Sequence, residues 1–332
     1  NEIGAGLFVG SGSDKLYAYN SDLSFSNNRN PDPNAKYNQS GIWVTATDAG
    51  DGCNGDAEFH LYGGTLKINN NDLNGVQSSL NGHFVMNCTD TNVEVCDNGK
   101  LKYGFFASGD GLSYGYYTFT GTYENKPTLN IDGNKQNGVT GGSMKNTALD
   151  IYGYNVSICD NGRYGAYVSA YNNSTANSVI KNSNINISGN GSTNLFFKTN
   201  SIIDNSNIVA DGQSKNESTK HASTGINFSG KATINDSRVQ AHGNKSTGVN
   251  NAQNLIVDSS VLHIQDSKNA HNATNAKETG DITTLLTDYD VVALAANDTE
   301  KGMDSNFNYT AGKNQYLGKF VVEGGSLQAD KT

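Results

Sequence analysis

The chain has 332 residues, of which 35% are hydrophobic and 17% charged, and its formal net charge at pH 7 is -9. Such a chain is too polar for a conventional two-layer core, yet its apolar residues recur too regularly for disorder. The negative charge argues against a nucleic-acid partner, which would require a broad basic surface. No stretch approaches the roughly 20 apolar residues of a membrane-spanning helix, so we expect no membrane insertion.

An internal repeat runs through most of the chain. Nine segments align, and in each of them two apolar residues stand two positions apart, so that both side chains point to one face of a strand. We expect this face to form the core. The segments are SDLSFSNNR from Ser21, GTLKINNND from Gly64, TNVEVCDNGK from Thr91, PTLNIDGNK from Pro127, YNVSICDNGR from Tyr154, SNINISGNG from Ser183, SNIVADGQSK from Ser206, SRVQAHGNK from Ser237 and SVLHIQDSK from Ser260.

A polar residue recurs three positions beyond the second apolar residue of each segment. Stacked amides can form hydrogen bonds from coil to coil, and Asn tolerates the left-handed backbone conformation that a corner needs. The repeat therefore predicts an asparagine ladder. Its members are Asn28, Asn71, Asn98, Asn134, Asn161, Asn190 and Asn244, with Gln213 and Ser267 in the remaining coils.

Two further strands complete each coil. A glycine before an apolar residue marks one of them, as in Asn74-Gly75-Val76, and a short run such as Leu149-Asp150-Ile151 marks the other. We therefore predict an all-β fold, a right-handed parallel β-helix with three strands per coil and about nine to twelve coils.

We expect residues 1–332 to form a single solenoid domain, because each coil of such a fold contacts only its neighbours. The spacing between coils varies, which predicts insertions near residues 30–57 and 108–126 and a weaker one near 214–223. The repeat is lost near residues 270–319, where we expect an irregular segment. Loops inserted along one edge of a solenoid are a usual place for a binding surface.

Cations recur just beyond the ladder positions. Stacked coils lie about 4.8 Å apart, so these side chains would line one edge as a basic stripe that suits a polyanion. The alternative is that they only keep the exposed corners soluble. The cations are Arg29, Lys100, Lys135, Arg163, Lys215, Lys245 and Lys268.

Tyrosines are concentrated in one part of the chain, with ten of the 17 between Tyr103 and Tyr171. An exposed tyrosine ring offers a flat apolar face to a sugar, although the rings could instead pack an inserted hairpin onto the solenoid. Because the cations cross the same part of the sequence, we expect both to meet in one site for an acidic saccharide. The predicted ligand-binding residues are Lys100, Lys102, Tyr103, Tyr114, Tyr116, Tyr117, Lys135, Arg163 and Tyr164.

The cysteines and turn aspartates carry no recognisable chemistry. Cys96 and Cys159 occupy one column two coils apart, which places them beyond disulfide reach. A Cys53–Cys88 or a Cys88–Cys96 pair remains open. The aspartates beside the ladder stand at turns where Asp is ordinary, so we assign them no metal, cofactor or catalytic role; they are Asp97, Asp132, Asp160, Asp211 and Asp266.

The repeat resembles the pectate-lyase-like superfamily of parallel β-helices, many of which cut polysaccharides. Polygalacturonases of that superfamily carry an Asn-Thr-Asp segment, an Asp pair, a Gly-His-Gly and an Arg-Ile-Lys, and none of these strings occurs here. Pectate lyases rely on a Ca²⁺-binding acidic cluster with a catalytic arginine, whereas this chain has only Arg29, Arg163 and Arg238. No active site of either kind is recognisable, and the fold alone does not specify an activity. We therefore expect that the chain is not an enzyme.

The Asn-, Thr-, Asp- and Lys-rich composition, as in residues 272–279, looks like cell-wall-anchored surface proteins of lactobacilli. Among these, the chain is similar to the β-solenoid binding regions of serine-rich repeat adhesins. The resemblance implies a non-enzymatic, extracellular binding region on the bacterial surface that attaches to host mucin glycoproteins or pectin-like polysaccharides. The alternatives are a polysaccharide lyase or glycoside hydrolase of the same fold, and a passive spacer.

Two expectations follow from the termini and the charge. The first residues carry neither Met nor a signal pattern, and residues 321–327 read like the opening of a coil, so we expect a piece of a longer, wall-anchored polypeptide that is monomeric in isolation. Near pH 4, protonated carboxylates would no longer oppose an anionic glycan while Lys and Arg stay charged. We therefore expect binding to strengthen in acid.

Overall fold

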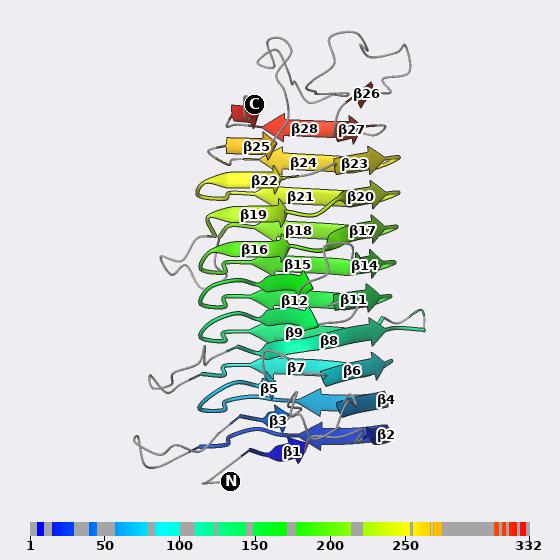
Figure 1. Ribbon diagram of the computed structural model, residues 1–332, viewed down its shortest axis with the longest axis vertical. Coiled ribbons are helices and arrows are strands. Elements are labelled where there is room, and N and C mark those ends of the chain that lie inside the picture. Colours follow the sequence, from blue (N-terminus) through cyan, green and yellow to red (C-terminus); the bar gives the residue numbers. More distant parts are fainter. Residues whose placement is uncertain are drawn as a thin grey trace, which may run out of the picture.

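The computed structural model confirms the right-handed parallel β-helix (Figure 1). Parallel strands stack coil upon coil from the N-terminal to the C-terminal end, and each coil contributes a strand to each of three faces. The structure describes residues 5–9, 15–29, 40–44, 57–78, 84–99, 110–122, 124, 126–143, 149–170, 177–213, 222–252, 255–265, 267, 269–273, 309–311, 314–316, 319–323 and 326–329. No helix that could cross a membrane occurs in these ranges.

Most strands of the first face begin at or just after the recurrent glycine. They are β1 (Leu7–Val9), β3 (Ile42–Val44), β5 (Val76–Ser78), β10 (Val139–Ser143), β13 (Ala166–Ala170), β16 (Thr193–Phe197), β19 (Thr224–Phe228), β22 (Thr247–Asn251), β25 (Asn269–Ala273) and β29 (Ser326–Ala329). The second face holds β6 (Phe84–Thr89), β11 (Leu149–Tyr152), β14 (Asn177–Lys181), β17 (Asn200–Asp204), β20 (Ala232–Asn235), β23 (Leu255–Asp258) and β27 (Asn314–Tyr316), which pairs antiparallel with β26 (Tyr309–Ala311).

The third face contains the aligned repeat segments. It holds β7 (Asn92–Cys96), β9 (Thr128–Asp132), β12 (Asn155–Cys159), β15 (Asn184–Ser188), β18 (Asn207–Asp211), β21 (Arg238–His242), β24 (Val261–Gln265) and β28 (Lys319–Glu323). Three long strands turn a corner without a break: β2 (Lys15–Ser24) and β4 (Ala57–Lys67) run from the second face to the third, and β8 (Leu112–Thr120) runs from the first to the second.

The core is a narrow column of apolar side chains, because alternate residues of every strand point inward. Val156 in β12 lies between Leu129 of the preceding coil and Ile185 of the next, and all three are nearly inaccessible to solvent. The predicted alternation of the repeat segments is therefore confirmed.

The asparagine ladder is present at the corner between the third and first faces, which we call the asparagine corner. The Asn161 Nδ2 atom donates to the Asn190 Oδ1 atom at 2.9 Å, and Asn134 donates to Asn161 in the same way. The left-handed conformation was expected at the ladder residue itself, but it belongs to the residue before it, such as Asp97 or Asp160. These aspartates are thus turn residues.

The ladder changes where its sequence changes. Asn190 donates instead to the Asn194 Oδ1 atom at 2.8 Å, and Asn194 donates to the Asp211 carbonyl oxygen at 2.7 Å. Asn194 stands where most coils have the recurrent glycine, and its amide takes the place that Gln213 does not fill. Farther along, the ladder residue after Asn244 is Ser267. The Ser267 hydroxyl accepts the Asn244 backbone N–H at 3.4 Å, but the Asn244 side-chain amide has no partner among the described residues.

A serine ladder supports the corner between the second and third faces. The backbone N–H of Ser183 donates to the Ser206 hydroxyl at 3.1 Å, and this bond repeats from Ser206 to Ser237 and from Ser237 to Ser260 at 3.0 Å. A buried backbone donor is thereby satisfied in each of these coils, which holds the turn in place.

The segment 108–126 was expected to be an insertion, and for its central part this is wrong. Strand β8 pairs with β6 and β11 and contributes to the core, because Tyr117 and Phe119 stand two residues apart and both side chains are buried. The insertion expected near 30–57 and the irregular segment near 270–319 lie mostly outside the described residues.

The cysteines form no disulfide within the described residues. Cys96 and Cys159 lie in one column with Asp132 between them, as predicted, and Cys88, Cys96 and Cys159 are all free. A Cys88–Cys96 bond is therefore absent, while Cys53 lies outside the described residues.

Candidate functional site

The structure describes five of the nine predicted ligand-binding side chains. Lys100, Lys102 and Tyr103 lie outside the described residues, and so does the side chain of Tyr114. The described members are Tyr116, Tyr117, Lys135, Arg163 and Tyr164.

Tyr117 is not available to a ligand, which corrects its assignment as a binding residue. Its ring is fully buried and packs edge-on against Phe84, with ring centroids 6.3 Å apart. Phe119, two residues later, is buried as well, as expected when residues two apart on a strand share one face.

Tyr116 and Arg163 do not meet, although they were expected to share one site. Tyr116 opens the second-face part of β8, where its hydroxyl donates to the Asp150 Oδ2 atom at 3.3 Å. Arg163 lies at the asparagine corner, in the column that begins the first face. The length of a first-face strand, roughly 15–20 Å, separates the two positions. Proximity in sequence was a poor guide because one coil surrounds the whole core.

The described cations of the expected stripe are Arg29, Lys135, Arg163 and Lys245, all exposed at the asparagine corner. They do not form one straight column. Gly162 stacks on Lys135 in the next coil, so closely that a Cβ atom added to Gly162 would lie 1.9 Å from the Lys135 carbonyl oxygen. Arg163 stacks on Gln136 instead, and its backbone N–H donates to the Gln136 carbonyl oxygen. Lys135 and Arg163 are therefore neighbours offset by one residue, and the other predicted cations fall outside the described ranges.

A cluster of cations and aromatic rings lies on the outer side of the first face, beside this corner. We call it the corner patch, and it consists of Arg163, Tyr164, Tyr167, Phe196 and Lys198. The Arg163 guanidinium lies 4.9 Å from the centre of the Tyr164 ring, and the Lys198 Nζ atom lies 5.3 Å from the centre of the Tyr167 ring. The three rings contact one another, with centroids 5.2–5.9 Å apart.

Register explains how the corner patch forms. Tyr167 of β13 lies opposite Phe196 of β16, while the flanking Ala166 and Val168 point into the core. The rings are only partly covered, and the two cations are exposed. Neither Arg163 nor Lys198 forms an ion pair with a carboxylate in the described part of the chain. The patch thus offers aromatic faces and two positive charges that form no ion pair within the described residues.

A buried carboxyl group lies in the column that contains Tyr164. Asp110 accepts hydrogen bonds from the Asn137 backbone N–H at 3.0 Å and from the Thr140 hydroxyl at 2.8 Å, and Asn137 in turn accepts the Tyr164 N–H. Burial raises the pKa of Asp110 to about 6, although its hydrogen bonds and the positive charge of Arg163 act in the opposite direction. The carboxyl group therefore changes charge in mild acid, close to the corner patch.

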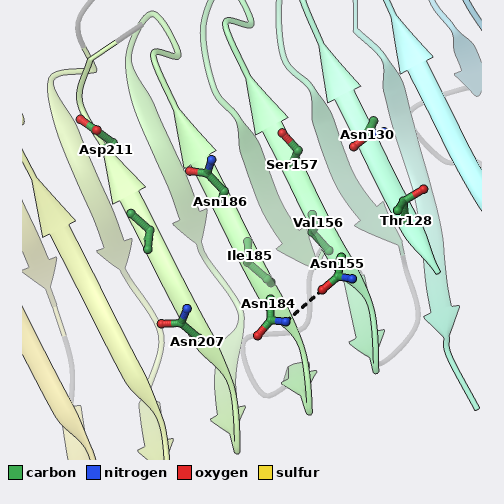
Figure 2. Close-up of a pocket in the computed structure, with 11 residues that line it drawn as sticks. Thr128, Asn130, Asn155, Val156, Ser157, Asn184, Ile185, Asn186, Asn207 and Asp211 are labelled. Atoms are coloured by element: carbon green, nitrogen blue, oxygen red, sulfur yellow. Dashed lines mark hydrogen bonds between the residues drawn. The ribbon is translucent and has the colours of Figure 1, made fainter. Parts of the chain in front are cut away.

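A shallow groove of about 550 Å³ lies on the outer side of the third face (Figure 2). It crosses β9, β12, β15 and β18, and most of its polar lining is uncharged amide and hydroxyl groups. Figure 2 shows Asn155, Asn184 and Asn207 in one row, and Asn184 donates to the Asn155 Oδ1 atom at 2.9 Å. This amide groove lies across the asparagine corner from the corner patch, because β12 and β15 lead through that corner into β13 and β16. Its amides can hydrogen-bond sugar hydroxyls.

Three members of the corner patch were missed in the sequence: Tyr167, Phe196 and Lys198. Aligning the residues that follow the recurrent glycine would have found two of them. Gly165-Ala166-Tyr167-Val168 and Asn194-Leu195-Phe196-Phe197 each place an aromatic residue at the same outward position, but Asn194 hides the repeat by replacing the glycine.

Comparison of the chain with protein-family models, with curated proteins and with solved structures gives no match.

Proposed function

We propose that this protein is a non-enzymatic bacterial surface adhesin region that binds acidic glycans, with the corner patch as the binding site. The observation that carries the proposal is the placement of Arg163 and Lys198 over two partly exposed tyrosine rings. Sugar rings offer apolar faces that pack on aromatic side chains, and carboxylates accept charge-assisted hydrogen bonds from exposed cations. An acidic pyranose presents both groups.

The amide groove supports the same proposal. Its Asn, Ser and Thr side chains supply donors and acceptors without repelling an anion, apart from Asp211 at one end. A polysaccharide chain held at the corner patch can extend across the asparagine corner and bond its hydroxyls to the groove.

Asp110 provides a local reason for glycan binding to strengthen in acid, as expected from the net charge. Asp110 carries a negative charge near Arg163 at neutral pH and loses it as the pH falls below about 6. Losing that charge makes the potential around the corner patch more positive. Acidic glycans should therefore bind more tightly in mild acid, before most surface carboxylates titrate.

A polysaccharide lyase or hydrolase remains the alternative. Hydrolysis by a carboxylate pair needs two carboxyl groups about 5–9.5 Å apart. Asp110 and Asp150 both have a pKa raised by burial, but Asp110 lies at the asparagine corner and Asp150 on the second face. The length of a first-face strand, roughly 15–20 Å, separates them, which does not favour a catalytic pair.

The test measures binding to immobilised polygalacturonate and to mucin near pH 7 and pH 4, together with sugar release in the same wells. The double variant Arg163→Gln/Lys198→Gln removes both charges and keeps polar side chains. Lys67→Gln is the matched control, because Lys67 is exposed on the third face near the N-terminal end of the solenoid, far from the corner patch. Charge-assisted hydrogen bonds contribute about 1.5–3 kcal/mol each, so the double variant should lose at least tenfold in affinity while the control changes less than twofold.

Two results would contradict the proposal. Unchanged binding by the double variant would show that the corner patch is not the site. Release of unsaturated or reducing sugar would show that the protein is an enzyme.

A further inference from the structure

We propose that the outer side of β2 and β4 carries a second saccharide site, which takes the flat face of an uncharged pyranose ring. The site consists of Tyr17, Tyr19, His60 and Tyr62, which we call the tyrosine platform. It lies on the second face near the N-terminal end of the solenoid, where Figure 1 shows β2 and β4 adjacent. It is independent of the corner patch, so either site can fail alone.

The platform is built from two neighbouring ring stacks. Tyr17 stacks on His60 with centroids 4.8 Å apart and planes 8° from parallel, and Tyr19 stacks on Tyr62 at 5.0 Å and 9°. The stacks stand two residues apart along the strand, a distance of about 7 Å. They share one outer surface because residues two apart in a strand point the same way.

The platform exposes unusually large apolar surfaces. Tyr17, Tyr19 and Tyr62 are 49%, 64% and 36% exposed, and they are the exposed large hydrophobic residues of the described chain. Exposure falls from Tyr19 to Tyr62 because Tyr19 covers one face of Tyr62. Among the described strands β2 pairs only with β4, so no ring of a described strand covers the outer faces of Tyr17 and Tyr19.

The local charges neutralise one another, which favours an uncharged ligand. The Lys15 Nζ atom lies 2.8 Å from the Glu58 Oε1 atom, and the His60 Nε2 atom lies 2.7 Å from the Glu58 Oε2 atom. These two contacts also lower the pKa of Glu58, so its carboxylate stays charged and balances Lys15. The platform therefore differs from the corner patch, where the positive charges have no carboxylate partner in the described chain.

The size of the platform favours a sugar over a protein partner. With a tyrosine surface of roughly 200 Å², the exposed fractions leave about 300 Å² of open ring surface. A specific protein interface needs roughly 500 Å² on each partner. The platform instead matches the footprint of one or two sugar rings, and the Glu58 carboxylate and Asn87 amide beside His60 provide polar groups at its edge.

The test uses one saccharide backbone in two charge states: a fully methyl-esterified oligogalacturonide, which is neutral, and its de-esterified form. Affinity is measured by calorimetry at low and high salt. The variant Tyr19→Ala/Tyr62→Ala should lose at least tenfold in affinity for the neutral oligomer, and Tyr19→Phe/Tyr62→Phe should keep it, because the rings remain. The Arg163→Gln/Lys198→Gln variant should bind the neutral oligomer normally, and salt should have little effect.

A second readout separates ligand binding from a purely structural role of the stacked rings. Nitration of tyrosines by tetranitromethane should modify Tyr17, Tyr19 and Tyr62, and the neutral oligomer should slow this modification at least fivefold. Tyr117 and Tyr154, which are fully buried, serve as internal controls for folding.

Three results would overturn the platform proposal: no binding of the neutral oligomer by the wild type, equal binding by the alanine variant, or a molar mass in solution that shows self-association lost in that variant. The last outcome would mean that the platform is an interface between copies. If the corner-patch variant still binds the acidic oligomer while the alanine variant loses the neutral one, the proposed function fails and the platform stands.

Discussion

Asp110→Asn should stabilise the protein at neutral pH. Asp110 is 1% exposed, and burial raises its pKa from 3.8 to about 6. Asparagine already occupies the same column at Asn74 and Asn137, so it fits the space and can accept the Asn137 N–H. The substitution removes a charge that the folded state holds at an energetic disadvantage.

The magnitude follows from linkage. A folded-state pKa above the unfolded value contributes stability that is complete below about pH 4, and that stability is lost as the pH rises through about 6. A shift of about two units corresponds to about 3 kcal/mol. The variant should therefore match the wild type near pH 4, gain on it between pH 4 and 6, and exceed it by up to about 3 kcal/mol above pH 6.

The assay is urea unfolding of both proteins at a series of pH values from 4 to 8. Asp160→Asn is the matched control, because Asp160 is partly exposed at a left-handed turn position that asparagine tolerates. A stability difference that stays flat across this range, or a variant that is less stable at pH 8, would refute the reasoning about the buried charge.

Three further predictions concern binding, the ladder and the thiols. Asp110→Asn should bind polygalacturonate at pH 7 as tightly as the wild type does near pH 5, and a variant that still needs acid would point to other groups. Asn161→Ala should lower the free energy of unfolding by about 3 kcal/mol or more, because the buried partners of its amide lose their hydrogen bonds. Asn155→Ala, on the exposed surface, should change the free energy of unfolding by less than about 0.5 kcal/mol. Equal melting curves for the two variants would contradict this prediction. Burial raises the pKa of Cys96 to about 12, so its alkylation at pH 8 should be roughly a thousandfold slower in the folded protein than in urea, and fast labelling would contradict the buried environment.

The scaffold could be predicted from sequence because its rules are local and periodic. The pair Val93 and Val95 reveals the inward face of a strand without any knowledge of its neighbours, and a polar residue three positions later marks a corner. The exceptions at Asn194 and Gln213 could not be predicted in this way. Asn194, which stands at the position of the recurrent glycine, accepts the hydrogen bond of Asn190 that the ladder residue Gln213 would otherwise accept.

The candidate site could be predicted only in part. Arg163 and Tyr164 belong to the corner patch, but Tyr117 does not face solvent and Tyr116 lies on another face. Tyr167 and Phe196 share an outward position that an alignment of the first-face segments would have revealed, whereas Lys198 could be placed beside them only from the register between coils. The inward direction of Tyr117 was readable from Phe119 two residues later; the exposure of Tyr19 depended on which strands lie beside β2.

The asparagine ladder shows that the rise of the solenoid does not depend on how much chain each coil contains. Successive ladder partners are 43, 27, 36, 27 and 29 residues apart in sequence, yet their amides meet at 2.7–2.9 Å every time. A coil can therefore gain or lose residues between its strands without changing the position of the next coil. Such a scaffold lets the segments between strands diverge freely during evolution while the spacing of the outward-facing side chains is preserved.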